Sequence, residues 1–225
     1  MFNFDFMADY QKNYWLSLGV TLEISVLVVI FGTILGAILY FFKSSGLHIG
    51  KVRPLNWISC IFIEILRGTP VLLQIMIAYS GSKMFLNLSF SPFTAATLAL
   101  SMNASIYIAE DIRAGIQSVP KGQIEAGRSL GMTRVQVLKN ITIPQAIKTV
   151  LPALGNEFVA IIKESSMAST IGVAELTFTS KIVQGATYSP LAPLIVSAIF
   201  YFALTFILGR TVGFFERRNK LADVK

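Results

Sequence analysis

Long apolar runs separated by shorter polar segments dominate this chain. Uncharged stretches cover residues 24–42, 68–82, 84–109 and 182–209, and charges interrupt a further apolar run at 149–174. A helix rises about 1.5 Å per residue, so it needs about 20 residues to cross a hydrocarbon core of roughly 30 Å. The lengths of these runs therefore predict helices that span a lipid bilayer.

The pattern predicts five transmembrane helices, and hence an all-α membrane protein. Their expected positions are residues 16–42, 57–80, 93–114, 147–165 and 190–212. The fourth is the least regular, because Glu157, Lys163 and Glu164 interrupt its apolar run. An arrangement with four crossings therefore stays open. In either case residues 1–225 are expected to form a single transmembrane domain.

Composition and charge agree with a membrane location. The chain is 54% apolar and only 14% charged, which does not suit a surface that water covers. Its net charge of +7 could indicate a nucleic-acid partner, but the basic residues lie mainly between apolar runs instead of forming one cluster. If the amino terminus is outside and the carboxyl terminus cytoplasmic, Lys12, Lys83 and Lys181 face outward and most other basic residues face the cytoplasm. The single cysteine, Cys60, allows neither an internal disulfide nor a cysteine-built metal site.

Small residues recur where transmembrane helices are expected to meet. Gly32 and Gly36 lie four positions apart on the first helix, and Ser101, Ser105 and Ala109 form a stripe on the third. Small side chains let two helix backbones approach closely in a membrane. We expect these positions to serve packing within the chain.

A polar segment at residues 115–146 separates the third and fourth helices, and it is long for a simple connection. Its first helical pattern starts at Pro120 and stops at Gly131, a residue type that ends helices at positive φ. Its second starts at Thr133, where Gln136 can complete a capping box. The segment therefore predicts a bent pair of short helices.

The second short helix is expected to end before Pro144 and to carry an apolar face formed by Val135, Leu138 and Ile141. Such a face could insert into a groove on a partner protein. An amphipathic hairpin lying on the bilayer surface would show the same pattern. The physical pattern alone leaves both interpretations open.

The spacing within this segment is more specific than its periodicity. The sequence resembles the "EAA" loop of the membrane subunits of ABC importers, which reads Glu-Ala-Ala, three residues, Gly, nine residues, Ile, any residue, Leu-Pro. The matching positions here are Glu125, Ala126, Gly127, Gly131, Ile141, Ile143 and Pro144. Gly127 replaces the second alanine of the pattern and Ile143 replaces its leucine, so both changes keep a small or apolar side chain.

Further runs narrow the resemblance to the polar amino-acid permeases, the group for histidine, arginine, glutamine and cystine. They are Arg-Gly-Thr-Pro at 67–70, Ile-Ala-Glu at 108–110, Arg-Ala-Gly-Ile at 113–116, Leu-Pro-Ala-Leu-Gly-Asn-Glu at 151–157 and Lys-Glu-Ser-Ser at 163–166. The resemblance implies the transmembrane fold of type I ABC importers. It also implies a bacterial inner-membrane permease subunit of an ATP-driven amino-acid importer, which forms the translocation pathway and transmits motion through its cytoplasmic loop.

The same resemblance implies the partners. They are an ABC ATPase dimer, a second permease subunit, with a homodimer favoured over a heterodimer, and an extracytoplasmic solute-binding protein. The chain has no glycine-rich phosphate loop that ends in Gly-Lys-Ser or Gly-Lys-Thr. ATP and Mg²⁺ are therefore expected on the partner ATPase subunits, no cofactor is expected in this chain, and the chain is not expected to be an enzyme.

Polar residues deep within the predicted helices are candidates for substrate contact. Arg67, Asn103 and Glu157 each lie about ten residues into their helix, hence about 15 Å from its start and near the bilayer midplane. A charge at this depth costs about 2.5 to 3.5 kcal/mol on insertion scales, so it needs a partner or a function. Gly68 and Pro70 can break the second helix beside Arg67, and a broken helix at this depth must face protein or a wet cavity.

A cavity of this kind suits a zwitterion. Glu157 could hold a cationic group, Asn103 could form hydrogen bonds, and Arg67 or the backbone amides around Thr69 could attract a carboxylate. The resemblance implies that Asn103 and Glu157 line the substrate cavity. In the alternative interpretation, Glu157 pairs with Arg67 or Lys163 and Asn103 joins helices as a structural residue.

Two other functional classes compete with the importer subunit. A self-contained secondary carrier or channel could use Glu157 and Lys163 as a coupled charge pair. An intramembrane enzyme could use Glu64 or Glu157 as an acid or base, but no nucleophile with a base, metal-ligand cluster or cofactor motif accompanies them.

Overall fold

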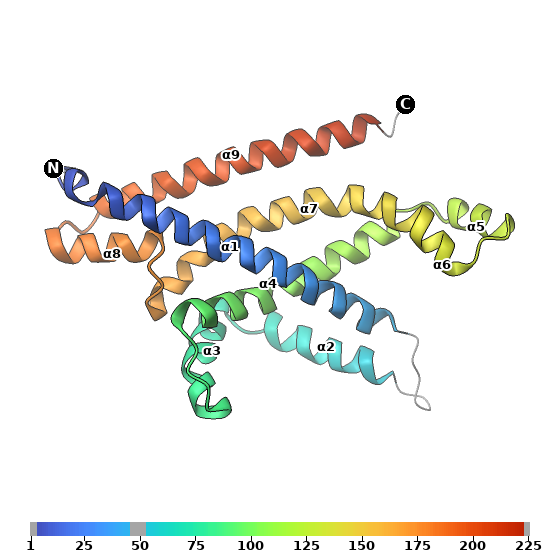
Figure 1. The fold of residues 1–225 in the computed structure, drawn as a ribbon, viewed down its shortest axis with the longest axis horizontal. Coiled ribbons are helices and arrows are strands. Elements are labelled where there is room, and N and C mark those ends of the chain that lie inside the picture. Colours follow the sequence, from blue (N-terminus) through green and yellow to red (C-terminus); the bar gives the residue numbers. More distant parts are fainter. Residues whose placement is uncertain (1–3, 46–52, 223–225) are drawn as a thin grey trace.

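The computed structural model describes residues 4–45 and 53–222, and the regular structure in these ranges is helical throughout (Figure 1). The elements in chain order are α1 (Met7–Ser44), α2 (Pro54–Arg67), α3 (Val71–Leu86), α4 (Pro92–Gln117), α5 (Lys121–Ser129), α6 (Arg134–Val137), the π-helical turn η1 (Leu138–Thr142), α7 (Ile143–Glu164), the 3-10 helix η2 (Ser165–Ile171), α8 (Leu176–Thr187) and α9 (Ala192–Ala222). The predicted all-α fold class is confirmed.

Helix α4 forms the centre of the bundle, because α1, α3 and α7 all pack against it. Glycines of α1 make the closest approach possible. A Cβ at Gly36 would lie 3.0 Å from both the Ser105 carbonyl oxygen and Ile108, and one at Gly32 would lie 3.3 Å from the Ala104 Cβ. The predicted close packing of these small-residue stripes within the chain is thus confirmed.

The predicted second helix is two helices. Helix α2 ends at Arg67, α3 begins after Pro70, and their axes differ by 106°. Proline fixes its own φ and disfavours helical geometry in the preceding residue, so the chain turns where the sequence predicts a break. A continuous helix over 57–80 is wrong, but the position of the interruption is confirmed.

Among the described residues, two helices are long and apolar enough to cross a membrane, namely α1 and the Ala192–Arg218 part of α9. The bent α2–α3 pair is apolar enough to form either a broken span or a re-entrant loop. By the same criterion, α4 and α7 do not stand out within the described residues. Helix α4 carries buried polar side chains, including Ser101, Asn103 and Ser105, which lower its hydropathy while facing protein. A central helix can therefore be less apolar than its lipid-facing neighbours.

Several ends differ from the predicted ones because hydropathy detects only the apolar part of a helix. Helix α1 starts at Met7 and α9 continues to Ala222, beyond the predicted 16–42 and 190–212. Helix α8 was not predicted at all. The fully buried Glu175 caps it, accepting from the backbone N–H groups of Thr177 at 2.9 Å and Phe178 at 2.8 Å.

Different elements lie at the two ends of the long axis of the molecule (Figure 1). The start of α1 and the whole of α8 lie at the left end of the view, whereas α5 and α6 form the tip at the right end. Helix α9 runs from the left end toward the right. The two ends of the described chain therefore lie toward opposite ends of the bundle.

The α1–α4 contact gives a direct test of the fold. We expect Gly36→Leu to destabilise the protein by about 1–3 kcal/mol, because the added atoms overpack a contact that includes backbone. Gly19→Leu is the matched control on the same helix, since a Cβ there meets nothing within 4 Å. Melting temperatures of the two purified variants in detergent measure the difference, and equal values would contradict this packing.

Candidate functional site

The break between α2 and α3 is held by one side-chain amide. Gln74 Nε2 donates to the carbonyl oxygens of Leu66 at 2.7 Å and Thr69 at 3.1 Å, and to Thr69 Oγ1 at 3.0 Å. Thr69 Oγ1 in turn donates to the Ile65 carbonyl at 2.9 Å. Carbonyls that the interrupted helix leaves open thus receive donors from nearby side chains.

The same amide connects the break to the central helix. Asn103 on α4 is 3% exposed, and its Nδ2 donates to Gln74 Oε1 at 3.2 Å. Two predicted substrate residues, Thr69 and Asn103, are therefore joined through Gln74, which the sequence analysis did not single out. The available signal was a lone amide in an apolar stretch just after the predicted break.

Arg67 and Glu157 do not join this network. Arg67 is the last residue of α2 and is exposed, and Glu157 is half-buried on α7. In the described part of the chain, Glu157 forms no ion pair with Arg67 or Lys163. The structural pairing considered for Glu157 is thus absent from this structure.

Glu157 and Asn103 lie on two helices that pack against each other, α7 and α4. Helices α4 and α7 touch where Gly115 faces Val150, since a Cβ at Gly115 would lie 2.4 Å from that side chain. At about 1.5 Å per residue, Asn103 lies about 18 Å from this contact along α4 and Glu157 about 10 Å along α7. Both residues therefore lie on the side of this contact away from the hairpin, with Asn103 buried and Glu157 half-buried.

An apolar groove of about 390 Å³ adjoins the polar network. Thr69 and Gln74 form part of its wall, and Leu73, Ile77 and Met102 supply apolar surface from α3 and α4. The break thus combines hydrogen-bonding groups with an adjacent hydrophobic recess, as small-molecule sites commonly do.

The polar segment folds into the predicted bent helical pair. Helix α5 ends before Gly131, whose φ of +85° is accessible to glycine at little strain. Thr133 and Gln136 form both hydrogen bonds of a capping box at the start of α6. The break, the glycine stop and the cap are all confirmed.

The second short helix was predicted to end before Pro144, and this prediction is wrong. Helix α6 continues through η1 into α7, and the Ile143 N–H bonds to the Leu138 carbonyl five residues back. The π turn inserts one residue where Pro144 has no N–H to donate, so the chain stays helical. The hairpin is thereby connected to α7 without a flexible joint.

The predicted apolar face of the second helix is divided between two environments. Ile141 packs inward, where a Cβ at Gly127 would lie 2.7 Å from its Cδ1. Val135 is 72% exposed, and Leu130 at the bend is 85% exposed. Glu125 is exposed as well. The α5–α6 hairpin, which lies at the far right of Figure 1, therefore exposes both apolar side chains and a carboxylate.

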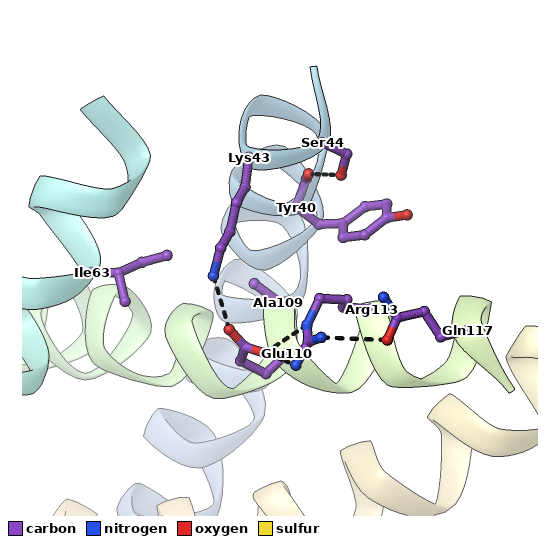
Figure 2. A pocket seen from close by; sticks show the side chains of 8 residues that line it. All are labelled: Tyr40, Lys43, Ser44, Ile63, Ala109, Glu110, Arg113 and Gln117. Atoms are coloured by element: carbon purple, nitrogen blue, oxygen red, sulfur yellow. Dashed lines mark hydrogen bonds and ion pairs between the residues drawn. The ribbon is translucent and has the colours of Figure 1, made fainter. Parts of the chain in front are cut away.

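An ion-pair cluster fixes the base of this hairpin. Figure 2 shows Lys43 from α1 and Arg113 from α4 converging on Glu110. Lys43 Nζ lies 3.0 Å from Glu110 Oε1, and Arg113 Nη2 lies 2.7 Å from Oε2. Arg113 Nη1 also donates to Gln117 Oε1 at 3.3 Å, at the end of α4. The cluster lines a pocket of about 250 Å³ and links α1 to the point where the hairpin begins.

The fold and these two sites define a class of protein. A polar network at a broken helix inside a bundle is a feature of membrane transport proteins. A helical hairpin with exposed apolar side chains is a surface that a partner protein can bind. Together these features are those expected of a helical membrane transport subunit.

The comparisons identify the family. Residues 32–221 match the sequence profile described as "Binding-protein-dependent transport system inner membrane component". The chain is 37% identical to the arginine transport system permease protein ArtQ of Bacillus subtilis, over 98% of this chain and all of that one. It is 36% identical to the glutamine transport system permease protein GlnP of Escherichia coli, over 89% of this chain and 90% of that one. The chain belongs to this family of inner-membrane transport components.

Solved structures agree. An amino acid ABC transporter crystallised with histidines matches with a TM-score of 0.88 and 40% identity, over 97% of this chain and 99% of that one. The methionine transporter MetNI matches with a TM-score of 0.70 at 20% identity, which supports the fold alone. The resemblance to ABC-importer permeases is thus confirmed, and the chain is a transport subunit and not an enzyme.

The hairpin packing gives a second test. We expect Gly127→Leu to push α5 away from Ile141, so the α5 amides should exchange hydrogen faster in the purified protein. Gly122→Leu is the control on the same helix, because a Cβ there meets nothing within 4 Å. Protection unchanged in both variants would show that α5 does not depend on this contact.

Proposed function

We propose that this chain is the permease subunit of an ATP-driven importer of a polar amino acid, and that it forms the translocation pathway and couples to ATPase subunits through its hairpin. The observation that carries the proposal is the helical hairpin with the EAA spacing, which protrudes from a chain of the binding-protein-dependent transport family. The two relatives named above are permeases of arginine and glutamine transport systems, which favours an amino acid as cargo.

In the proposed topology the chain crosses a bacterial inner membrane five times, through α1, the α2–α3 pair, α4, α7 and α9. The amino terminus is outside and the carboxyl terminus is cytoplasmic. An odd number of crossings agrees with the opposite placement of the two ends of the described chain (Figure 1). The excess of basic residues at the hairpin end supports this orientation.

The proposed solute pathway passes the break between α2 and α3. The amino end of α3 has no side-chain cap, so its first N–H groups can face a carboxylate, with the exposed Thr69 at the edge of this site. Glu157 on α7 would attract the cationic group of the cargo, Asn103 would hydrogen-bond it, and the exposed Arg67 would add positive charge near the carboxylate. Opposite charges at separate positions suit an amino-acid zwitterion.

The proposed partners are an ABC ATPase dimer, which binds ATP and Mg²⁺, a second permease subunit, with a homodimer favoured, and an extracytoplasmic solute-binding protein. The exposed Leu130 and Val135 would fill a groove on the ATPase, with Glu125 beside them. The coupling residues are Glu125, Ala126, Gly127, Gly131, Ile141 and Pro144. Closure of the ATPase pair would move the hairpin and reorient the permease between its inward-facing and outward-facing states.

The structure supplies a mechanical route for this motion. Helix α7 runs from the hairpin to Glu157 through the π turn, and Pro152 inside α7 removes one backbone hydrogen bond along the way. Helix α4 carries Asn103 and is joined near its hairpin end to α1 by the Lys43–Glu110 pair. A rigid displacement of the hairpin would therefore reach both substrate residues along separate helices.

Coupling through the hairpin can be tested by charge reversal. We expect Glu125→Lys to reduce co-purification of the ATPase at least several-fold, because the exposed carboxylate lies on the proposed contact surface. Asp9→Lys makes the same charge change at the opposite end of the molecule and should leave assembly intact. Equal ATPase recovery with both variants would argue that the hairpin does not hold the ATPase.

Substrate contact by Glu157 can be tested in the reconstituted complex. We expect Glu157→Gln to abolish substrate-stimulated ATP hydrolysis while assembly survives, because the half-buried side chain loses its charge at nearly constant volume. Glu23→Gln is the control, since Glu23 is exposed on α1. Arginine, glutamine, cystine and histidine with the cognate binding protein form the substrate panel. Unchanged stimulation would make Glu157 a structural residue.

A further inference from the structure

The hydrogen bonds around Gln74 have only one possible direction. A backbone carbonyl can accept a hydrogen bond but cannot donate one. The group that faces the Leu66 and Thr69 carbonyls must therefore be the NH₂ group of Gln74, at 2.7 and 3.1 Å. This requirement fixes the orientation of the Gln74 amide and turns its oxygen toward α4.

The orientation of the Gln74 amide determines the orientation of the Asn103 amide. Gln74 Oε1 can only accept, so the group of Asn103 that meets it at 3.2 Å must be the NH₂ group. The Asn103 oxygen, Oδ1, consequently points away from Gln74. The side-chain amide of an asparagine can often rotate by about 180° at little cost. Here the two backbone carbonyls of the α2–α3 break fix Gln74, and Gln74 in turn fixes the amide of Asn103.

Oδ1 of Asn103 remains available. In the described part of the chain no donor reaches it, and no buried side-chain nitrogen or oxygen there lacks a partner. The oxygen therefore keeps contact with accessible space, although the residue as a whole is only 3% exposed. The Asn103 amide therefore presents an acceptor oxygen here, while one N–H of its Nδ2 is engaged by Gln74.

We infer that Gln74 is a positioning residue that holds the Asn103 amide with its oxygen toward the pathway, so the cargo group that Asn103 recognises is a nitrogen donor. This inference rests on the proposed function, in which Asn103 lines the pathway. The donor is an N–H of the cargo, either its α-ammonium group or a nitrogen of its side chain. Gln74 acts through Asn103 and through the break, without touching the cargo.

The measurement is equilibrium binding to the permease–ATPase complex without binding protein, so that the selectivity belongs to the permease. Arginine, glutamine, histidine and cystine are titrated first to find an amino acid that binds the wild-type complex. Two analogues of that amino acid follow, one without the α-amino group and one without the side-chain N–H groups. The analogue that binds more weakly identifies the donor and defines a selectivity ratio.

Two substitutions separate the two roles of Gln74. Gln74→Met has no hydrogen-bonding amide, so the Asn103 amide can rotate, and we expect the selectivity ratio to fall about tenfold, the equivalent of one hydrogen bond. Gln74→Glu keeps an oxygen that accepts from Asn103 Nδ2 but loses the NH₂ group that holds the break. It should therefore keep the ratio, while both variants melt at lower temperature. If Gln74 were purely structural, both variants would melt at a lower temperature and both would keep the selectivity ratio of the wild-type complex.

The inference is overturned if Gln74→Met keeps the wild-type ratio, or if Gln74→Glu loses as much of it as Gln74→Met. Asn103 provides the second pair if a Gln74 variant does not assemble. Asn103→Asp retains an outward oxygen and should keep the preference for the donor-bearing amino acid, whereas Asn103→Leu should lose it. Rejection of that amino acid by Asn103→Asp would mean that the cargo presents an acceptor, against the inference.

Failure of the proposed function has a different result. A wild-type complex that binds none of the four amino acids would refute both the proposed cargo class and the inference that rests on it. Wild-type binding with unchanged ratios in the variants would refute the inference alone.

Discussion

Backbone groups exposed by a broken helix must find partners within the protein, because hydrocarbon offers none. In this molecule the break between α2 and α3 meets that requirement with one glutamine side chain, Gln74, placed on the first turn of α3. The amide both bridges the bend and connects to Asn103 on α4. A constraint of folding in lipid has thus produced a fixed polar point inside the bundle, beside a hydrophobic recess.

The rest of the architecture connects that point to a distant surface. Helices α4 and α7 both extend from the interior of the bundle to the hairpin end. Each is connected to a neighbouring element there. Helix α4 is joined to α1 through Lys43 and Glu110, with Arg113 completing the cluster. Helix α7 receives the hairpin through η1. Ion pairs that stay partly accessible to solvent contribute little stability, so this cluster is expected to add only modestly to the free energy of folding.

Local rules explain which features could be predicted from the sequence. The break at Gly68 and Pro70, the stop at Gly131 and the Thr133 cap all depend on backbone chemistry within a few residues, and the structure contains each of them. The EAA spacing gave the family by resemblance. The pairing of Gln74 with Asn103 joins positions 29 residues apart, so it depends on how α3 packs on α4. Helix α8 was missed because a short helix with Thr and Ser residues has no transmembrane hydropathy.

The π turn at Leu138–Thr142 has an effect on the orientation of the hairpin as well as on its stiffness. Each residue of an α-helix turns the chain by about 100° about the helix axis. Adding or removing one residue between the hairpin and α7 would therefore rotate the hairpin by about 100° about the axis of α7. In the proposed assembly, the angle at which Leu130 and Val135 meet the ATPase would therefore depend on the number of residues in this turn. In that assembly, two permeases with identical hairpins but different residue counts in this turn would require differently oriented ATPase subunits.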